Sequence, residues 1–469
     1  MTQTVESLLQ AQRAAFHKEP RRSLQDRRAD LRKVEDMVAE GADEWIEAVS
    51  ADFGHRARIE TELLELSVVV RAARATRREL GQWMKPRRVP TPMLAAPGSS
   101  KVRYEPKGVV GVVSPWNYPI QLALMPLIAG LAAGCRVMIK PSELTPHTNA
   151  VMATRIARAF PADQVCLVEG GPEVAEAFTS APFDHLMFTG STRIGRKVAQ
   201  AAAANLMPLT LELGGKSPVF VDPAYDAKDA AHPLAWGRFL NAGQTCVAPD
   251  YILAIGGKDR AKSLAEAIIA QAETFYPQPH ANPDYTAVIS DRFYSRFEAM
   301  VDEARAAGVA VLQVAHDPAA AKAARKFPPT VLIDPPAHLE VMRDEIFGPI
   351  LPVLSMASRE EALAHVRAGG HPLALYVFSK SQDWVSHVLD RTQSGGVTVN
   401  GTMLHLANDN LPFGGVGESG YGAYRGRRGF EEFSHARSVF ATGGWHSTRL
   451  AAPPYGGLAR RIADLAMKL

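Results

Sequence analysis

Cysteine is scarce in this chain, which has only Cys135, Cys166 and Cys246 among its 469 residues. Their spacing matches neither a metal-binding motif nor a paired disulfide framework. We therefore expect no metal site and no disulfide bonds. Free cysteines of this kind are typical of a reducing compartment, so the sequence favours a cytoplasmic location.

The chain also lacks a signal segment, a long apolar run and a strong excess of charge. MTQTVESLLQAQ, at the start, has no basic residues followed by an apolar run, so we expect no secretory signal. The most apolar stretch, 122–135, contains Pro126 and is too short to span a bilayer, which predicts a buried helix. The net charge is only +3, and the Arg-rich stretch 21–32 alternates with Asp and Glu. That pattern indicates a solvated helix face rather than a nucleic-acid patch.

The length of the chain is too great for one hydrophobic core, so we expect two or three domains. Apolar positions recur every three or four residues through 8–49 and 59–83, which predicts helices. After about residue 102, strands and helices alternate, as in a doubly wound parallel sheet with helices on both faces. The expected strands are the Val-rich run within 102–119 and 136–140, 164–170, 185–190 and 209–213; the expected helices are 147–160, 172–180 and 191–206. The alternation resumes after Gly214, which predicts a second α/β domain.

Cys246 lies in the stretch NAGQTCVAPD (241–250), among small and polar residues. Such surroundings suit a nucleophilic thiol, although most lone cysteines are simply buried. A second stretch, LTLELGGKSP (209–218), supplies Glu212, which is either a water-activating base or an ordinary strand residue. Taken together, the two residues fit covalent catalysis through a thioester.

Two segments place polar or small residues directly after expected strands. FTGSTRIG (188–195) puts Gly190 and Ser191 at the start of a helix, where they form either a pyrophosphate site or a plain capped turn. Lys140 and Glu143 follow the strand 136–140. They either bind a ribose or belong to an ordinary charged loop.

Two further segments have both a chemical and a structural interpretation. Asn117, in SPWNYP (114–119), is either an oxyanion donor that acts with the backbone N–H of Cys246 or a side chain that stabilises its own turn. Glu345 and Phe347, in EIFGPI (345–350), are either contacts of a cofactor or parts of a packed turn.

These segments occur together in a known order. SPWNYP, IKPSE, FTGST, LELGGKSP, GQTC, EIFGP and LPFGGVGESG have the order and approximate spacing seen in the aldehyde dehydrogenase superfamily, and the resemblance covers about residues 5–440. GQTCVAPDYIL, LHLANDNLPFGGVG and GFEEFSH resemble its class 3 and coniferyl aldehyde dehydrogenase branch. The resemblance implies an α/β aldehyde dehydrogenase-like fold, with a Rossmann-type cofactor domain, a second α/β catalytic domain and a small bridging segment.

The resemblance also implies roles for individual residues. Cys246 would be the nucleophile, Glu212 the general base and Asn117 the oxyanion donor. The implied reaction is NAD(P)-dependent oxidation of an aldehyde to its acid, through a thioester on Cys246. Contacts to the cofactor are implied for Trp116, Lys140, Glu143, Gly190, Ser191, Gly195, Gly214, Gly215, Glu345 and Phe347.

The domain organisation that the resemblance implies has four parts and a dimeric assembly. Residues 1–213 would form the cofactor-binding domain, with a bridging hairpin near 84–106, and residues 214–404 the catalytic domain. Residues 405–440 would be a bridging segment that joins two copies in a homodimer, and 441–469 a tail.

The choice of substrate and cofactor is less constrained. The branch implies an aromatic aldehyde such as coniferaldehyde, or a medium-chain aliphatic aldehyde. Glu143 favours NAD, because a carboxylate accepts ribose hydroxyls and repels a 2′-phosphate, whereas Lys140 nearby leaves NADP open. Two alternatives remain. A CoA-acylating relative would have no use for Glu212, and an inactive binding or structural relative would need none of the catalytic residues.

Some features depart from the branch or lie outside its motifs. Glu418, Arg425 and Cys135 stand where the branch usually carries other residues, which weakens any transfer of substrate identity. The aromatic residues near the motifs, which either line a substrate tunnel or pack in the core, are Tyr118, Trp236 and Phe239. The tail LARRIADLAMKL (458–469) predicts an amphipathic helix. We expect it to pack on the body of the protein rather than on a membrane surface.

Overall fold

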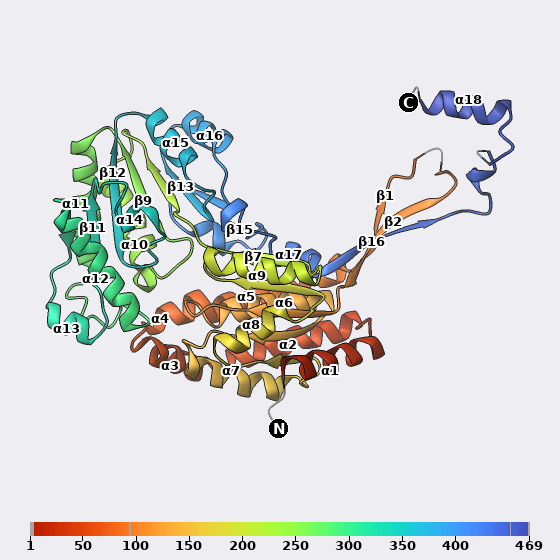
Figure 1. Ribbon diagram of the computed structural model, residues 1–469, viewed down its shortest axis with the longest axis horizontal. Helices are drawn as coiled ribbons and strands as arrows, with labels where there is room; N and C mark the ends of the chain where they lie inside the picture. The colour runs from red at the N-terminus through yellow and green to blue at the C-terminus, as the bar shows by residue number, and fades with distance from the viewer. Residues whose placement is uncertain (1–3, 93–94, 451, 468–469) are drawn as a thin grey trace.

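Three β-sheets organise the chain in the computed structural model, which describes residues 4–92, 95–450 and 452–467. Two of the sheets lie side by side with helices around them, and the third extends away from them as an arm (Figure 1). This architecture confirms the predicted α/β fold with parallel sheets. The assignment of domain limits within it stays a prediction.

The first sheet contains six strands in the order β15-β7-β6-β3-β4-β5. All neighbours are parallel except β15, which runs antiparallel to β7. Its core strand β3 reads VVGVV, and such a Val-rich run suits a strand buried on both faces. The strands are β3 (Val109–Val113), β4 (Arg136–Lys140), β5 (Val165–Leu167), β6 (His185–Thr189), β7 (Leu209–Glu212) and β15 (Gly420–Tyr421).

Helices from the first 204 residues surround this sheet. The apolar stretch identified in the sequence forms α6, and every residue of that helix after the first is buried. A helix that is apolar on all sides must lie inside the protein, as predicted. The elements are α1 (Val5–Lys18), α2 (Leu24–Ala39), α3 (Ala42–Phe53), α4 (Arg58–Thr61), the π-helix η1 (Glu62–Leu66), α5 (Ser67–Trp83), α6 (Gln121–Ala133), α7 (Pro146–Ala159), α8 (Pro172–Ser180) and α9 (Thr192–Ala204).

The second sheet contains seven strands in the order β10-β11-β12-β9-β8-β13-β14, and only β10 is antiparallel to its neighbour. The chain passes from the first sheet to the second between Glu212 and Pro218. The strands are β8 (Pro218–Val221), β9 (Tyr251–Ile255), β10 (Ala310–Gln313), β11 (Thr330–Ile333), β12 (Ile350–Met356), β13 (Ala374–Phe378) and β14 (Gly396–Val399). The helices are α10 (Ala227–Phe239), η3 (Leu240–Gly243), α11 (Lys258–Phe275), α12 (Asp291–Ala306), α13 (Pro318–Ala323), α14 (Glu340–Arg343), α15 (Arg359–Ala368) and α16 (Gln382–Arg391).

The third sheet joins distant parts of the sequence in the order β1-β2-β16. Strand β16 pairs along its whole length with β2, from Ser434 opposite Pro106 to Ala441 opposite Ser99. The predicted hairpin near 84–106 and the end of the predicted bridging segment therefore lie in one sheet. The elements are β1 (Arg87–Val89), β2 (Ser99–Pro106) and β16 (Ser434–Ala441), preceded along the chain by η4 (Leu404–Ala407), η5 (Gly417–Ser419) and α17 (Gly426–Glu432).

The tail does not pack as the sequence analysis predicts. After η6 (Ser447–Leu450), helix α18 (Gly457–Ala466) lies beyond the arm and away from both large sheets (Figure 1). None of the ten residues of α18 is buried. The expectation that this helix packs on the body is wrong for the single chain, because the arm carries it away from both large sheets. Among the described helices, none combines the length and the apolar character needed to cross a membrane.

Candidate active site

Three of the residues singled out in the sequence lie at one edge of the first sheet. Strands β3, β4 and β6 are parallel neighbours, with Val113 paired to Lys140 and to Phe188. The loops that follow them therefore start at the same edge, where α/β proteins bind their ligands. Asn117 lies in the loop after β3, Lys140 ends β4, and Gly190 follows β6.

The predicted nucleophile lies just after a strained turn. Helix α10 gives way to η3, in which Asn241 and Ala242 have φ angles of 52° and 50°. Residues with side chains rarely adopt positive φ, and such conformations persist only where surrounding contacts impose them. Cys246 follows this turn and is half-buried. The turn presents the thiol at a position fixed by tertiary contacts.

The Cys246 thiol is surrounded by groups that oppose its ionisation. Burial, together with the negative charges of Glu345 and Glu212, raises the pKa of the Cys246 thiol to about 12. The cation of Arg425 acts in the opposite direction. The resting thiol is consequently protonated at neutral pH, and both predicted carboxylates lie close enough to influence it.

Glu212 ends β7 in a buried position, and neither of its carboxyl oxygens has a hydrogen-bond partner among the described residues. Burial raises the pKa of this carboxyl well above its ordinary value. Arg425 lowers it, and Glu432 raises it further. A carboxyl with a raised pKa and unsatisfied oxygens is the kind of group that can take a proton from water near neutral pH.

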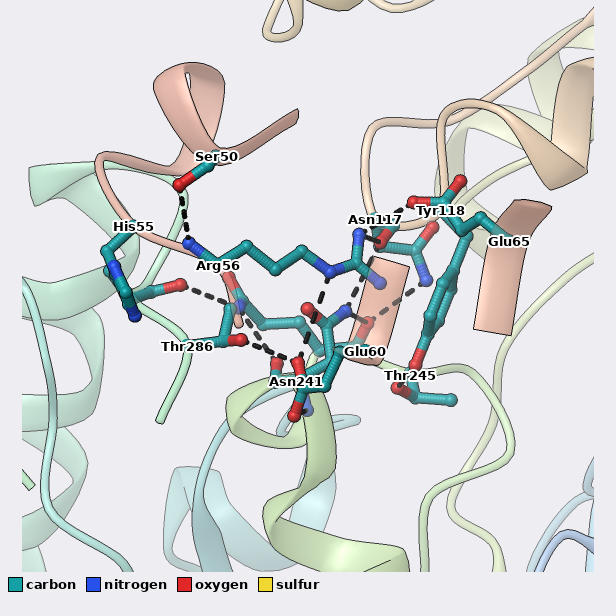
Figure 2. A network of polar contacts seen from close by, with 12 residues as sticks. Ser50, His55, Arg56, Glu60, Glu65, Asn117, Tyr118, Asn241, Thr245 and Thr286 are labelled. Carbon is teal, nitrogen blue, oxygen red and sulfur yellow. Dashed lines mark hydrogen bonds and ion pairs between the residues drawn. The ribbon is translucent and has the colours of Figure 1, made fainter. Parts of the chain in front are cut away.

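Asn117 is tied to the loop that carries Cys246. Its side-chain Nδ2 donates a hydrogen bond of 3.0 Å to the backbone oxygen of Gln244, two residues before the thiol. The next residue, Tyr118, shares a hydrogen bond of 2.7 Å with the hydroxyl of Thr245 (Figure 2). An amide nitrogen carries two hydrogens, so Asn117 keeps one for a further acceptor such as an oxyanion.

Lys140 and Glu143, the predicted ribose contacts, differ strongly in exposure. Lys140 is buried and donates to the backbone oxygen of Pro141 at 2.7 Å, whereas Glu143 is exposed. Burial lowers the pKa of Lys140, and the charges of Glu143 and Glu169 oppose that change. Glu169 follows β5 at the same edge of the sheet. It has no distinctive motif around it, so no sequence signal points to it.

The FTGSTRIG segment forms the expected strand-to-helix turn. The hydroxyl of Ser191 caps α9 by accepting from the backbone N–H of Ile194 at 3.4 Å. Gly190 precedes it and donates its backbone N–H to the backbone oxygen of Glu212 at 3.0 Å, so small residues stand at the helix start, which suits a pyrophosphate. Gly195 is different, because it is buried and a Cβ there would lie 2.6 Å from Leu213 Cδ2. The structure thus gives Gly195 a packing reason to be glycine.

Glu345 lies directly against the backbone of Gly214. Any Cβ at position 214 would collide with the carboxyl of Glu345, so this close approach requires glycine. Burial and the charge of Asp250 raise the pKa of Glu345 to about 8, and the backbone N–H of Gly215 opposes the rise. Glu345 also acts on Cys246, so the EIFGPI turn and the LELGGKSP segment reach the same site.

Trp116 and Phe347 are brought into contact, with ring centroids 5.4 Å apart and an edge-on arrangement. Phe293, which the sequence analysis did not select, also packs against Trp116, with ring centroids 5.2 Å apart. Phe347 has a φ of 52°, so it too is held in a strained turn. These rings provide an apolar wall beside a carboxylate, a composition that fits a planar cofactor ring next to a ribose.

The three aromatic candidates for a substrate tunnel differ in how deeply they are buried. Phe239 is completely buried in the main core, so its role is packing. Tyr118 is also buried, and its hydroxyl is engaged by Thr245. Trp236 is half-buried on α10, close to the strained turn. Of the three, Trp236 keeps the exposure that contact with a substrate requires.

The site therefore combines a thiol, the buried carboxyl of Glu212, the half-buried carboxyl of Glu345 and an amide donor beside the edge of a parallel sheet. Known proteins share this architecture. A family model described as the aldehyde dehydrogenase family matches residues 1–439. The chain is 42% identical over 465 residues to a probable coniferyl aldehyde dehydrogenase of Pseudomonas aeruginosa, covering 99% of this chain and 96% of that protein. It is 38% identical over 428 residues to a dimeric NADP-preferring aldehyde dehydrogenase of Rattus norvegicus, covering 91% and 92%.

Solved structures show the same similarity. The substrate-bound state of Staphylococcus aureus AldH has a TM-score of 0.93 and 35% identity, with 99% of this chain and 100% of that chain covered. An aldehyde dehydrogenase of Mycobacterium tuberculosis in complex with NAD+ has a TM-score of 0.83 and 27% identity, with 94% and 90% covered.

Proposed function

The chain belongs to the aldehyde dehydrogenase family and is an NAD(P)-dependent enzyme of aldehyde oxidation, and we propose that it oxidises aromatic or medium-chain aldehydes through a thioester on Cys246. One observation supports this most strongly. The charges of Glu212 and Glu345 both act on the Cys246 thiol, and Asn117 is hydrogen-bonded to the loop that carries it.

In the proposed mechanism, Cys246 passes its thiol proton to the Glu212 carboxylate, which releases it to solvent. The thiolate attacks the aldehyde carbon, and the aldehyde oxygen becomes an oxyanion. Asn117 donates its remaining amide hydrogen to that oxygen, together with the backbone N–H of Cys246. Removing one donor of this kind typically costs ~10²–10³ in rate. The bound nicotinamide supplies the hydride acceptor. Glu212 then takes a proton from water, and the water hydrolyses the thioester on Cys246 to release the acid.

The residues of the sheet edge fit a dinucleotide. Gly190 and Ser191 would bind the pyrophosphate at the start of α9, and Lys140 with Glu143 would bind the adenosine ribose. Glu345 would bind the nicotinamide ribose beside Gly214, with Phe347 and Trp116 against the ring. Gly195 would support this arrangement by letting α9 approach Leu213 closely.

We propose NAD+ as the preferred cofactor. Lys140 is buried and already donates to Pro141, while Glu143 and Glu169 place two negative charges near it. A 2′-phosphate would meet these carboxylates, whereas ribose hydroxyls can donate to them. The rat relative whose name states a preference for NADP shows that both choices occur among relatives of this chain.

We further propose a homodimer built on the arm. Strand β16 exposes six of its eight residues, as Phe440 does at 49%, and no residue of β2 is fully buried, which would suit a partner sheet. The substrate class rests on the relatives named for coniferyl aldehyde and on half-buried Trp236 beside the strained turn.

The test is reduction of NAD+ and NADP+ by the purified protein with coniferaldehyde, benzaldehyde, hexanal and decanal. We expect NADH with coniferaldehyde or hexanal, at a higher kcat/KM than with NADP+. Product that forms only when coenzyme A is added would indicate an acylating enzyme instead. Bound NAD+ without turnover of any aldehyde would indicate an inactive relative.

A further inference from the structure

A buried ion pair lies beneath the loop of Asn117, outside the residues assigned to catalysis. Arg56 Nη1 and Glu65 Oε1 are 2.8 Å apart, and both side chains are 0% exposed (Figure 2). Glu60 adds a second buried carboxylate, with an oxygen 4.0 Å from Arg56 Nε. Burying charges is costly, and apolar residues of similar size often give equal or greater stability. Stability alone therefore gives a weak reason for this pair.

The ion pair holds both ends of the turn that contains Asn117. The same Nη1 atom of Arg56 donates to the backbone oxygen of Asn117 at 3.3 Å. The second oxygen of Glu65 accepts from the backbone N–H groups of Ile120 at 2.7 Å and Gln121 at 3.1 Å. The guanidinium also lies over the ring of Tyr118, 4.8 Å from its centroid. The residues from 117 to 121 are consequently fixed by one charged unit.

The same network reaches the strained turn before Cys246. Glu60 accepts from the backbone N–H of Asn241 at 3.1 Å and from the hydroxyl of Thr286 at 2.6 Å. The side chain of Asn241 donates to the backbone oxygens of both Asn117 and Gln244, each at 3.2 Å. Figure 2 shows these residues converging on Asn117 from three separate parts of the chain. The positive φ of Asn241 is thus held by contacts from the network.

We propose that Arg56, through its ion pair with Glu65 and its hydrogen bond to the backbone of Asn117, is a positioning residue that aims the Asn117 amide at the oxyanion formed on the substrate of Cys246. This rests on the proposed function. An oxyanion donor is effective only if it is held in place before the reaction, and a displacement of about 1 Å can cost about 10²-fold in rate. The network supplies that support from Arg56 in the loop between α3 and α4, from Glu60 on α4 and from Glu65 on η1.

The test is a double-mutant cycle between Arg56 and Asn117. Arg56→Lys keeps the charge but loses the rigid planar guanidinium whose Nη1 atom serves both acceptors. We expect it to lower the rate of the first turnover by about 10- to 100-fold, with the KM for NAD+ unchanged. Asn117→Ala should lower it by ~10²–10³. The double variant should match Asn117→Ala within about 2-fold, because Arg56 acts only through Asn117.

Glu65→Gln tests the proposal independently if Arg56→Lys does not fold, and Arg136→Lys serves as a control. Glu65→Gln removes the partner charge and should give the same non-additive result with Asn117→Ala. Arg136→Lys is the matched control, since Arg136 is buried on β4 and donates to the backbone oxygens of Asp163 and Ala15. It should change the melting temperature without changing the first-turnover rate.

The outcomes distinguish failure of the positioning role of Arg56 from failure of the proposed aldehyde oxidation. Rate losses that multiply in the double variants, or an unchanged rate in both Arg56→Lys and Glu65→Gln, would overturn the positioning role while the wild-type enzyme remains active. A wild-type protein that oxidises no aldehyde would instead refute the proposed function on which the role depends.

Discussion

The resting state of Cys246 gives a prediction that can be worked out in numbers. Burial and the carboxylates of Glu345 and Glu212 raise the pKa of this thiol from 9.0 to about 12. We therefore expect the enzyme without ligands to react slowly with iodoacetamide, which attacks only through the thiolate.

The size of the effect follows from the ionised fraction. At about pH 8, a thiol with a pKa of about 12 is ionised in ~1 molecule in 10⁴, compared with ~1 in 10 for the ordinary value of 9.0. The more basic thiolate is the better nucleophile, which recovers about 15- to 30-fold for three units of pKa. The net expectation is alkylation about 30- to 70-fold slower than for an ordinary thiol.

The assay is iodoacetamide labelling followed by peptide mass spectrometry between about pH 6 and 10. The rate at Cys246 should rise tenfold per pH unit without reaching a plateau. Glu345→Gln should increase the rate, and the gap should widen above about pH 8, where the pKa of Glu345 itself lies. A plateau that begins near about pH 7 would refute the reasoning, because it would require a thiolate stabilised in the resting site.

Three more predictions concern groups around the thiol. Glu212→Gln should raise the melting temperature at about pH 8 but little at about pH 4. The reason is that a carboxyl whose pKa is raised by folding destabilises the folded protein as pH rises above the pKa of that carboxyl in the unfolded chain. An equal gain in the exposed control Glu143→Gln would contradict this. Arg425→Gln should move the acid limb of the kcat profile to higher pH, since the cation lowers the pKa of Glu212; an unmoved limb would exclude that influence. Gly214→Ala should weaken NAD+ binding in calorimetry, because its Cβ would displace the carboxyl of Glu345; unchanged affinity would place the ribose elsewhere.

The strands and helices of the first large sheet could be predicted because their signals are local, whereas for the second sheet only the continued alternation of strands and helices was predicted. The alternation of apolar runs located β4 at its observed limits, and the apolar stretch located α6. The catalytic candidates could also be found, because each lies in a short segment of distinctive composition. Parallel pairing of β3, β4 and β6 brings the segments of Asn117, Lys140 and Gly190 to one edge, which is a consequence of topology rather than of any single motif.

The supporting contacts could not be predicted in the same way. Arg56 and Asn117 are 61 residues apart, and Glu60 and Thr286 are 226 apart, so no local pattern links them. In the sequence, Arg425 stands out only as a departure from the related branch. Its effect on the pKa of Glu212 depends on β15 pairing with β7, which no local pattern indicates. The predicted packing of α18 on the body was wrong for the same reason, since amphipathicity does not specify which surface a helix contacts.

The most direct test of the thioester mechanism is the intact mass of Glu212→Gln after mixing with NAD+ and an aldehyde that the wild type oxidises. If Glu212 activates water for hydrolysis, the variant should accumulate the acyl adduct, mapped to Cys246, while forming about one NADH per site. Continuous turnover with no adduct would contradict Glu212 as the base, and an adduct on any other residue would contradict Cys246 as the nucleophile.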